Sequence, residues 1–134
     1  MSKPRAISMN VTINAKPSEV FQALTDSKHI VKWSGQKGKV EATIGGKFEL
    51  FDGWVKGKVL AFQEGKALSY TWHPDDWDDD VEPSIVRFAF SRAKAGTKIL
   101  LKHSGFPDEQ ARKEHQGGWK KHVFEPLKGF FESR

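Results

Sequence analysis

The chain of 134 residues carries 22 basic and 17 acidic side chains, a formal net charge of +5, and 37% hydrophobic residues. This length suits one domain with its own core, and the hydrophobic content excludes a disordered chain. The absence of cysteine excludes disulfides, thiolate metal sites and a cysteine nucleophile. We expect a single domain over residues 1–134, in the cytoplasm, because no apolar run has the length or form of a signal peptide or a membrane span.

The N-terminal part of the chain predicts one strand followed by two short helices. Apolar residues alternate from Ala6 to Asn14, which is the period of a half-buried strand. A helix is expected from Pro17 to about Thr25, because proline suits the first helical turn. Asp26 or Ser27 can cap a second short helix that ends near Gly35.

Glycine-containing turns divide the middle of the chain into six predicted strands. Asp52-Gly53 is a typical two-residue hairpin signal, and Gly45-Gly46 and Glu64-Gly65 mark further turns. The predicted strands are Lys39–Thr43, Lys47–Asp52, Trp54–Phe62, Ala67–Trp72, Ser84–Ser91 and Thr97–Ser104. Tight connections suit antiparallel neighbours, whereas parallel neighbours need long crossovers, so we expect an antiparallel meander.

The segment from about Pro107 to Ser133 is long enough for a major helix. Trp119 and Val123 lie at helical spacing and predict an apolar stripe that packs against the sheet. Gly117-Gly118 costs about 1 kcal/mol per residue relative to alanine and is expected to divide the helix. Pro126 lacks the N–H of an ordinary helical residue, so we also expect a kink there.

Acidic residues are concentrated in one loop. Six of the 17 acids lie between Asp75 and Glu82, and the loop lacks the glycine and distal glutamate of an EF-hand, so we expect it to be solvated and free of metal. Trp77 is expected to be an exposed ring on this loop that forms a lid. The basic residues are spread along the chain, so we expect no nucleic-acid partner, because such binding needs a contiguous basic stripe.

Short motifs follow one another in a characteristic order along nearly the whole chain. They are residues 15–26, Trp33, residues 44–48, Asp52-Gly53, residues 68–72, Gly96-Thr97, residues 103–106, His115 and Gly118-Trp119. In this order they resemble the START-like (SRPBCC) superfamily and, within it, the bacterial branch similar to the C-terminal domain of the heat-shock-protein-90 ATPase activator. The resemblance implies an α+β helix-grip fold, in which a curved antiparallel seven-stranded sheet wraps around a long C-terminal helix, with two short helices after the first strand.

The same resemblance implies a hydrophobic cavity between the sheet and the C-terminal helix. Strand alternation directs every second side chain toward that helix. The candidate cavity-lining residues are Phe48, Leu50, Tyr70, Trp72, Val86, Phe88, Phe90, Ile99, Leu101, His103, His115, Trp119 and Val123. Among apolar neighbours His103 should stay neutral and needs a hydrogen-bonding partner, which Tyr70 is expected to supply.

Relatives in this superfamily include lipid and hormone carriers, cyclases and co-chaperones, so the fold does not assign a function. The leading hypothesis is noncatalytic binding of a small hydrophobic, lipid-like or aromatic molecule, with no cofactor, metal or catalytic residue. One alternative is a cofactor-independent, cyclase- or hydrolase-like enzyme that uses His103 or His115 as acid or base. Another is a co-chaperone-like module that binds a chaperone or other protein through exposed Trp33, Trp54 or Trp77. Whether the protein is a monomer or a homodimer stays open.

Overall fold

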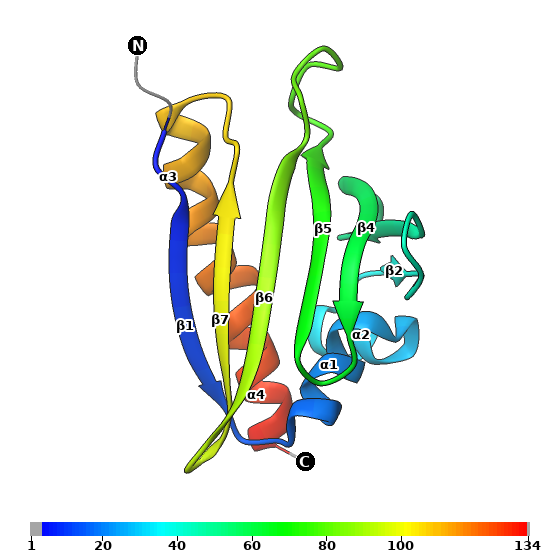
Figure 1. Cartoon of the computed structure of the whole chain (residues 1–134), viewed down its shortest axis with the longest axis vertical. Coiled ribbons are helices and arrows are strands. Elements are labelled where there is room, and N and C mark those ends of the chain that lie inside the picture. The colour runs from blue at the N-terminus through cyan, green and yellow to red at the C-terminus, as the bar shows by residue number, and fades with distance from the viewer. Residues whose placement is uncertain (1–3, 134) are drawn as a thin grey trace.

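A computed structural model describes residues 4–133 and shows an open curved sheet with a long helix lying along one of its faces (Figure 1). The strands are β1 (Ile7–Ile13), β2 (Lys39–Val40), β3 (Lys47–Leu50), β4 (Val55–Gln63), β5 (Ala67–Pro74), β6 (Ser84–Ala93) and β7 (Gly96–Ser104). The helices are α1 (Pro17–Thr25), α2 (Ser27–Ser34), α3 (Glu109–Gly118), the π-helical segment η1 (Trp119–Phe124) and α4 (Glu125–Glu132).

The seven strands form one antiparallel sheet in the order β1-β7-β6-β5-β4-β3-β2. Strands β2 to β7 follow one another as the predicted meander, and β1 joins the far edge by pairing with β7 from Ile7↔His103 to Ile13↔Thr97. The loops β3–β4 and β5–β6 and the segment after β7 therefore meet at one end of the sheet, which is the upper end in Figure 1.

Alternation along the strands places the expected side chains in the core. Burial alternates residue by residue along β5, where Leu68, Tyr70 and Trp72 are buried, and β6 and β7 show the same pattern. Each large side chain that is fully removed from water stabilises the fold by about 1.5–3 kcal/mol. The buried face packs against the C-terminal helix and against α1 and α2.

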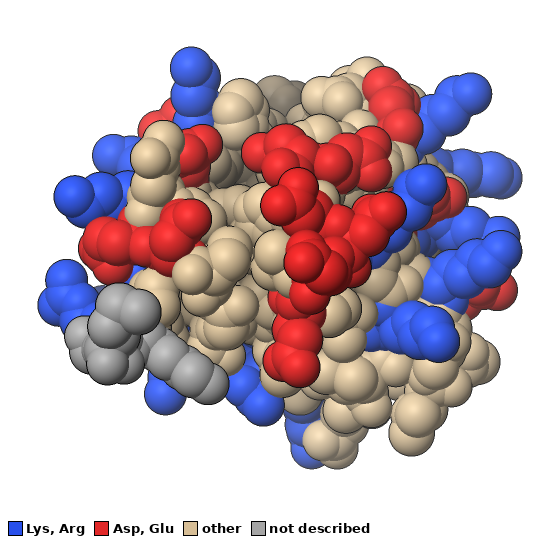
Figure 2. Space-filling view, turned by 90° about the horizontal axis from the view of Figure 1, so that it is seen from above, with Lys and Arg blue, Asp and Glu red and all other residues tan. Residues whose placement is uncertain are grey.

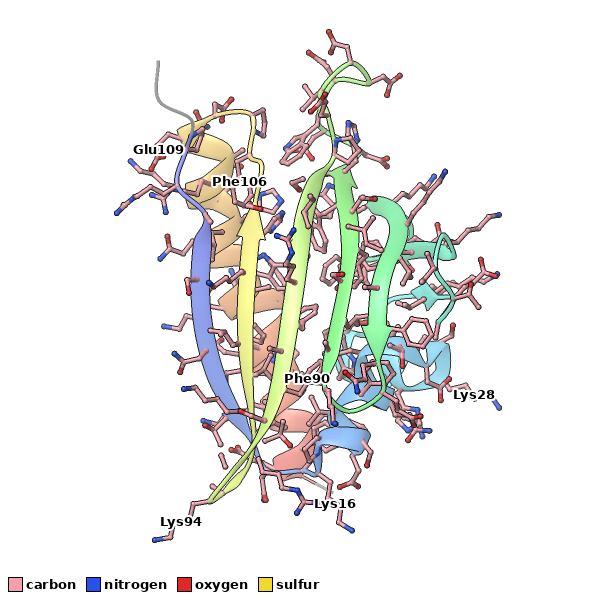
Figure 3. All side chains as sticks on the ribbon, viewed as in Figure 1. Lys16, Lys28, Phe90, Lys94, Phe106 and Glu109 are labelled. Carbon is pink, nitrogen blue, oxygen red and sulfur yellow. The ribbon has the colours of Figure 1, made fainter. Side chains whose placement is uncertain are left out.

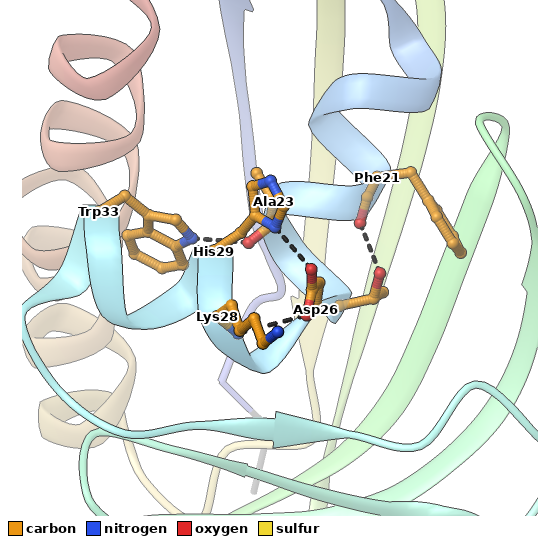
Figure 4. Close-up of polar contacts among 7 residues, drawn as sticks. Phe21, Ala23, Asp26, Lys28, His29 and Trp33 are labelled. Atoms are coloured by element: carbon orange, nitrogen blue, oxygen red, sulfur yellow. Dashed lines mark hydrogen bonds and ion pairs between the residues drawn. The ribbon is translucent and has the colours of Figure 1, made fainter.

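The corner between α1 and α2 is held by side-chain hydrogen bonds (Figure 4). Asp26 caps α2 by accepting from the Lys28 backbone N–H, and it also accepts from Nδ1 of His29 at 2.6 Å. The hydrogen bond from His29 lowers the pKa of Asp26. Trp33 donates from Nε1 to the Ala23 carbonyl at 2.7 Å and is only 5% exposed. The expectation of an exposed Trp33 anchor is therefore wrong, because its ring fills the space between the two helices.

The strands predicted over Lys39–Thr43 and Lys47–Asp52 are longer than the observed β2 and β3. The strand expected over Lys39–Thr43 ends at Val40, because the chain turns through a Gly46 N–H to Thr43 carbonyl hydrogen bond. The two-residue hairpin expected at Asp52-Gly53 is a longer loop, since Leu50 pairs with Val55.

Asp52 explains the longer loop. Its backbone N–H donates to the Lys37 carbonyl, and its carboxylate accepts from the Lys37 backbone N–H at 2.7 Å. This contact with a distant segment outweighs the local preference for a tight turn.

The C-terminal helix is continuous from Glu109 to Glu132, so the division expected at Gly117-Gly118 does not occur. Gly118 has ordinary helical dihedral angles, and the hydrogen-bond pattern changes directly after it to the wider π form. The Glu125 N–H accordingly bonds to the Lys120 carbonyl, five residues back. Pro126 lies directly after this segment, as the second residue of α4, and it makes no backbone hydrogen bond to the preceding turn because it has no N–H. The kink expected there stays a prediction.

No helix among residues 4–133 combines the length and the apolar character needed to span a bilayer.

Candidate functional site

A cleft of about 850 Å³ opens at the upper end of the sheet. It lies where the β3–β4 and β5–β6 loops approach α3 and η1. Its lining residues are Gln36, Phe51, Trp54, Trp72, Asp76, Trp77, Pro107, Asp108, Gln110, Ala111, Glu114, His115, Gly117, Gly118, Trp119, Lys121, His122 and Val123.

Four of the five tryptophans of the chain line this cleft. The rings of Trp72 and Trp119 lie 5.0 Å apart, and Trp54 meets Trp72 edge to face at 6.4 Å. Trp77 is half-buried, since its ring packs 5.6 Å from His115 and 6.4 Å from Phe106. The expectation that Trp77 is a free exposed ring is therefore wrong, and its indole forms part of the wall.

His103 lies below the cleft at the centre of a buried hydrogen-bond network. Trp119 Nε1–H donates to His103 Nδ1 at 3.0 Å, so the proton of the neutral ring resides on Nε2. That Nε2–H donates to the Ser84 hydroxyl at 2.8 Å, and the hydroxyl in turn donates to the Trp72 carbonyl. Burial, reinforced by His115, lowers the pKa of His103 to about 2, so the ring is neutral at physiological pH.

Tyr70 is not the partner of His103, contrary to the expectation. The register Tyr70↔Val86↔His103 places Val86 between the two side chains on the same face of the sheet. Tyr70 instead stacks on Phe48 with ring centroids 3.7 Å apart, and burial raises the pKa of its hydroxyl.

His115 repeats the same arrangement at the cleft surface. Trp72 Nε1–H donates to His115 Nε2 at 3.0 Å, so His115 Nδ1–H donates to the Ala111 carbonyl at 2.8 Å. Burial lowers the pKa of His115, and the hydrogen bond to the Ala111 carbonyl partly offsets this by raising it. The imidazoles of His103 and His115 lie 5.3 Å apart, each paired with one tryptophan.

Both histidines are held by hydrogen bonds within the protein. Both nitrogens of each ring already have a protein partner, and no carboxylate in the described part of the chain is hydrogen-bonded to either ring. General acid–base catalysis needs a nitrogen within reach of the reacting proton. Within residues 4–133 there is also no cluster of three or more His, Asp or Glu side chains suited to a metal ion.

Irregular backbone shapes two walls of the cleft. Phe51 and Asp52 have φ angles of 56° and 57°, in the left-handed region that residues other than glycine rarely adopt. Such a conformation costs about 1–3 kcal/mol per residue and is concentrated at functional sites. On the opposite wall the π segment presents Trp119 and Val123 to the cleft, and π segments inside α-helices are also frequent at functional sites.

The glycine pair in the C-terminal helix leaves room for the cleft. A Cβ added at Gly117 would meet no atom within 4 Å, and one at Gly118 would reach only His122 Cδ2 at 4.0 Å. Both glycines line the cleft. Side chains at these two helical positions would extend into space that is open in this protein.

The structure separates the thirteen candidate residues into two groups. Trp72, His115, Trp119 and Val123 line the cleft. The other nine are buried core side chains that do not line it, namely Phe48, Leu50, Tyr70, Val86, Phe88, Phe90, Ile99, Leu101 and His103. Phe90, for example, lies toward the lower end of the sheet, whereas Phe106 lies near the upper end beside the cleft (Figure 3).

Several cleft residues were not among the sequence candidates. Phe51, Gly117 and His122 line the cleft, and so does Trp54, which was expected only as an anchor for a protein partner. The available signal was the abundance of tryptophan together with a glycine pair inside a helix. Neither feature predicts which side chains meet in the cleft. That depends on how the β3–β4 loop, the β5–β6 loop and the segment after β7 pack at one end of the sheet.

A sequence model of the family described as Activator of Hsp90 ATPase homolog 1-like protein matches residues 14–132. The chain belongs to this family. The matched region begins directly after β1 and includes the whole C-terminal helix, so it contains every residue that lines the cleft. The family resemblance expected from the sequence motifs is confirmed.

Curated members of the Activator of Hsp90 ATPase homolog family match most of this chain. The human Activator of 90 kDa heat shock protein ATPase homolog 1 is 24% identical over 93% of the chain and 36% of its own length. The Saccharomyces cerevisiae Hsp90 co-chaperone AHA1 is 28% identical over 76% of the chain and 31% of its own length. The chain thus spans about a third of the length of the curated relatives it matches.

Solved structures confirm the helix-grip fold of this family member. A Mesorhizobium loti protein superposes with a TM-score of 0.82 at 28% identity, covering 96% of this chain and 98% of that one. An HSP90 activator from Plasmodium falciparum gives a TM-score of 0.85 at 22% identity, covering 95% of this chain and 96% of that one. The Aha1 dimer from Colwellia psychrerythraea, solved in solution, gives 0.78 at 20% identity, covering 96% of each chain.

Proposed function

We propose that the protein binds a small apolar, aromatic or lipid-like molecule in the cleft and does not transform it. The observation that carries this proposal is the cleft of about 850 Å³ with four indoles in its wall. Clefts of about 300–1,000 Å³ lined mainly by apolar and aromatic side chains are typical small-molecule sites.

The polar groups around the cleft support binding rather than catalysis. His103 and His115 orient Trp119 and Trp72 through the two indole N–H bonds. With these rings held in place, the wall is formed before the ligand arrives, which lowers the entropy cost of binding. The histidines therefore act in this proposal as supports of the wall.

Matched helical variants test the proposal. N-phenyl-1-naphthylamine, an uncharged fluorophore, should bind to the wild-type protein and quench tryptophan fluorescence. Gly118→Leu places a side chain in the cleft and should weaken this binding at least tenfold. Gly129→Leu adds the same side chain to α4 outside the cleft, in space with no atom within 4 Å, and should leave binding unchanged.

Two results would overturn the proposal. The first is a failure of the wild-type protein to bind the fluorophore together with native mass spectra that show no retained small molecule. The second is an equal effect of Gly118→Leu and Gly129→Leu, which would place the bound fluorophore elsewhere on the protein.

A second candidate function is binding to an Hsp90-type chaperone in the cytoplasm, supported by the family and by an exposed apolar patch. Ile44 is 79% exposed, and Leu60 and Phe62 on β4 are 41% and 38% exposed. Backbone hydrogen bonds between Val59 and residues 45 and 46 hold the Ile44 loop against β4. Patches of this kind mark protein-interaction sites.

The chaperone hypothesis is tested with purified components. If it holds, the protein should raise the ATPase rate of a purified Hsp90, and Ile44→Ser should reduce that effect. Val31→Ser changes an exposed apolar residue on α2, outside this patch, and serves as the control. No binding and no change in ATPase rate would exclude this function.

A further inference from the structure

We infer that the ligand of the cleft is a cation, with an aromatic or apolar body and an ammonium-type group. This inference rests on the proposed function, because it specifies the chemistry of the molecule that occupies the same cleft. Two independent features support it. The first is the excess of carboxylates around the opening, and the second is the set of indole rings in the wall of the cleft.

Among the charged residues that line the cleft, acidic side chains predominate, although the protein as a whole is basic. Asp76, Asp108 and Glu114 contribute three carboxylates, all from exposed positions. Lys121 is the one lysine or arginine among the described lining residues. The chain as a whole carries a formal net charge of +5, whereas the Asp, Glu, Lys and Arg side chains that line the cleft sum to a negative charge.

The surface around the opening extends this negative region. Figure 2 shows the upper end of the molecule, where carboxylates gather near the centre and most lysine and arginine side chains lie toward the margin. The central group includes the acidic β5–β6 loop, whose residues 75–82 contain six carboxylates. Charges within a Debye length of about 8–10 Å act together, so an approaching cation is attracted before it reaches the cleft.

Trp54, which is 38% exposed, and the half-buried Trp77 are the indoles most open to the cleft, whereas Trp72 and Trp119 are almost fully buried. Trp72 Nε1–H is occupied by His115, and Trp119 Nε1–H is occupied by His103. An anionic ligand therefore finds no donor on these two indoles. The face of an indole carries a negative quadrupole that attracts ammonium groups, and aromatic walls of this kind recognise quaternary ammonium ligands in other proteins.

The negative charge also reaches the floor of the cleft. Burial lowers the pKa of His115, and the charges of Asp76 and Glu114 act in the opposite direction on the same ring. These carboxylates come from two different elements, the β5–β6 loop and α3. A cation above His115 would lie in the field of both carboxylates and beside Trp54, whose ring lies 6.3 Å from that imidazole.

The experiment compares three probes that share a naphthalene body and differ in charge. The probes are (2-naphthylmethyl)trimethylammonium, 2-naphthylmethanol and 2-naphthylacetate, each titrated into the full chain by calorimetry. The cation should bind about tenfold more tightly than the alcohol, and the anion more weakly than both. Raising the salt concentration to 0.5 M should weaken binding of the cation and leave that of the alcohol nearly unchanged.

Charge-neutralising variants localise the effect. Asp76→Asn and Glu114→Gln should each reduce the preference for the cation over the alcohol by about threefold. Glu132→Gln, at the other end of the C-terminal helix, removes the same charge from outside the cleft and should not change the preference. Binding of the uncharged alcohol is the internal measure that each variant still folds and keeps its cleft.

The outcomes separate the two proposals. Equal binding of all three probes, or tightest binding of the anion, overturns the inference of a cationic ligand and leaves the proposed small-molecule function intact. An unchanged preference in Asp76→Asn and Glu114→Gln also overturns it. If none of the three probes binds, the proposed function itself fails, and the inference fails with it.

Discussion

His103 should make the protein lose stability as the pH falls below about 6.5. Its imidazole is buried and neutral, and burial lowers its pKa from an ordinary value of 6.5 to about 2. In the unfolded chain the ring regains the ordinary pKa and takes up a proton below pH 6.5. The unfolded state then binds a proton that the folded state does not, so acid favours unfolding.

The size of the effect follows from the two pKa values. The stabilisation is complete above pH 6.5 and is lost progressively as the pH falls toward 2, at about 1.4 kcal/mol per pH unit. Between pH 7 and pH 5 the free energy of unfolding should fall by about 2 kcal/mol through His103 alone. His115, whose pKa is also lowered by burial, adds to the loss in the same direction.

Urea unfolding at pH 7, 6 and 5, followed by tryptophan fluorescence, measures this dependence. His103→Gln keeps an amide that can accept from Trp119 and donate to Ser84 but cannot titrate. The variant should be less stable than the wild type at pH 7, and its free energy of unfolding should fall by about 2 kcal/mol less between pH 7 and pH 5.

The protonation state of His103 can also be measured directly in the wild-type protein. Nitrogen chemical shifts of the wild-type protein should show His103 as the neutral Nε2–H tautomer throughout pH 5–7. Titration of this ring near pH 6.5, or identical pH profiles for the wild type and His103→Gln, would refute the assignment of a buried neutral histidine.

Three further substitutions should change stability in stated directions, each measured by urea unfolding at pH 7. Gly117→Ala should stabilise the protein by about 1 kcal/mol, because alanine suits a helix interior better than glycine and its Cβ meets no atom; a loss of stability would show that the position is crowded. Gly57→Ala should destabilise it by about 2 kcal/mol or more, because the Cβ would lie 1.9 Å from the Thr71 carbonyl oxygen, and an unchanged midpoint would contradict this close approach. Asp108→Ala should cost about 1 kcal/mol through loss of the N-cap bond from the Ala111 N–H, whereas Asp108→Asn should retain most of it.

Local patterns were enough to predict the elements of the fold. Alternation and turn signals placed β5, β6 and β7 within one or two residues of their ends. The first residue of α1 was recognised from its neighbours in sequence, and the cap of α2, left open between Asp26 and Ser27, is Asp26. These signals work because each depends on a few consecutive residues and on the period of one element.

Contacts between distant segments account for the expectations that were wrong. Asp52 departs from the tight hairpin because it bonds to Lys37, which is 15 residues away. Trp33 is buried because Ala23 on another helix accepts its indole proton. The partner of His103 is Ser84 on a neighbouring strand, and no pattern along a single strand identifies a residue that lies beside it only after pairing.

The periodicity of the amino acids therefore determined which elements form, in what order, and which face of each strand is buried. It did not determine the cleft. Three separate parts of the chain supply Trp54, the pair Trp72 and Trp77, and Trp119, and these side chains meet only when the loops pack at one end of the sheet. Packing of those loops against α3 and η1 also decided which candidate side chains line the cleft and which fill the core. Strand alternation shows that a side chain faces inward, but only the tertiary structure shows whether other side chains pack around it completely.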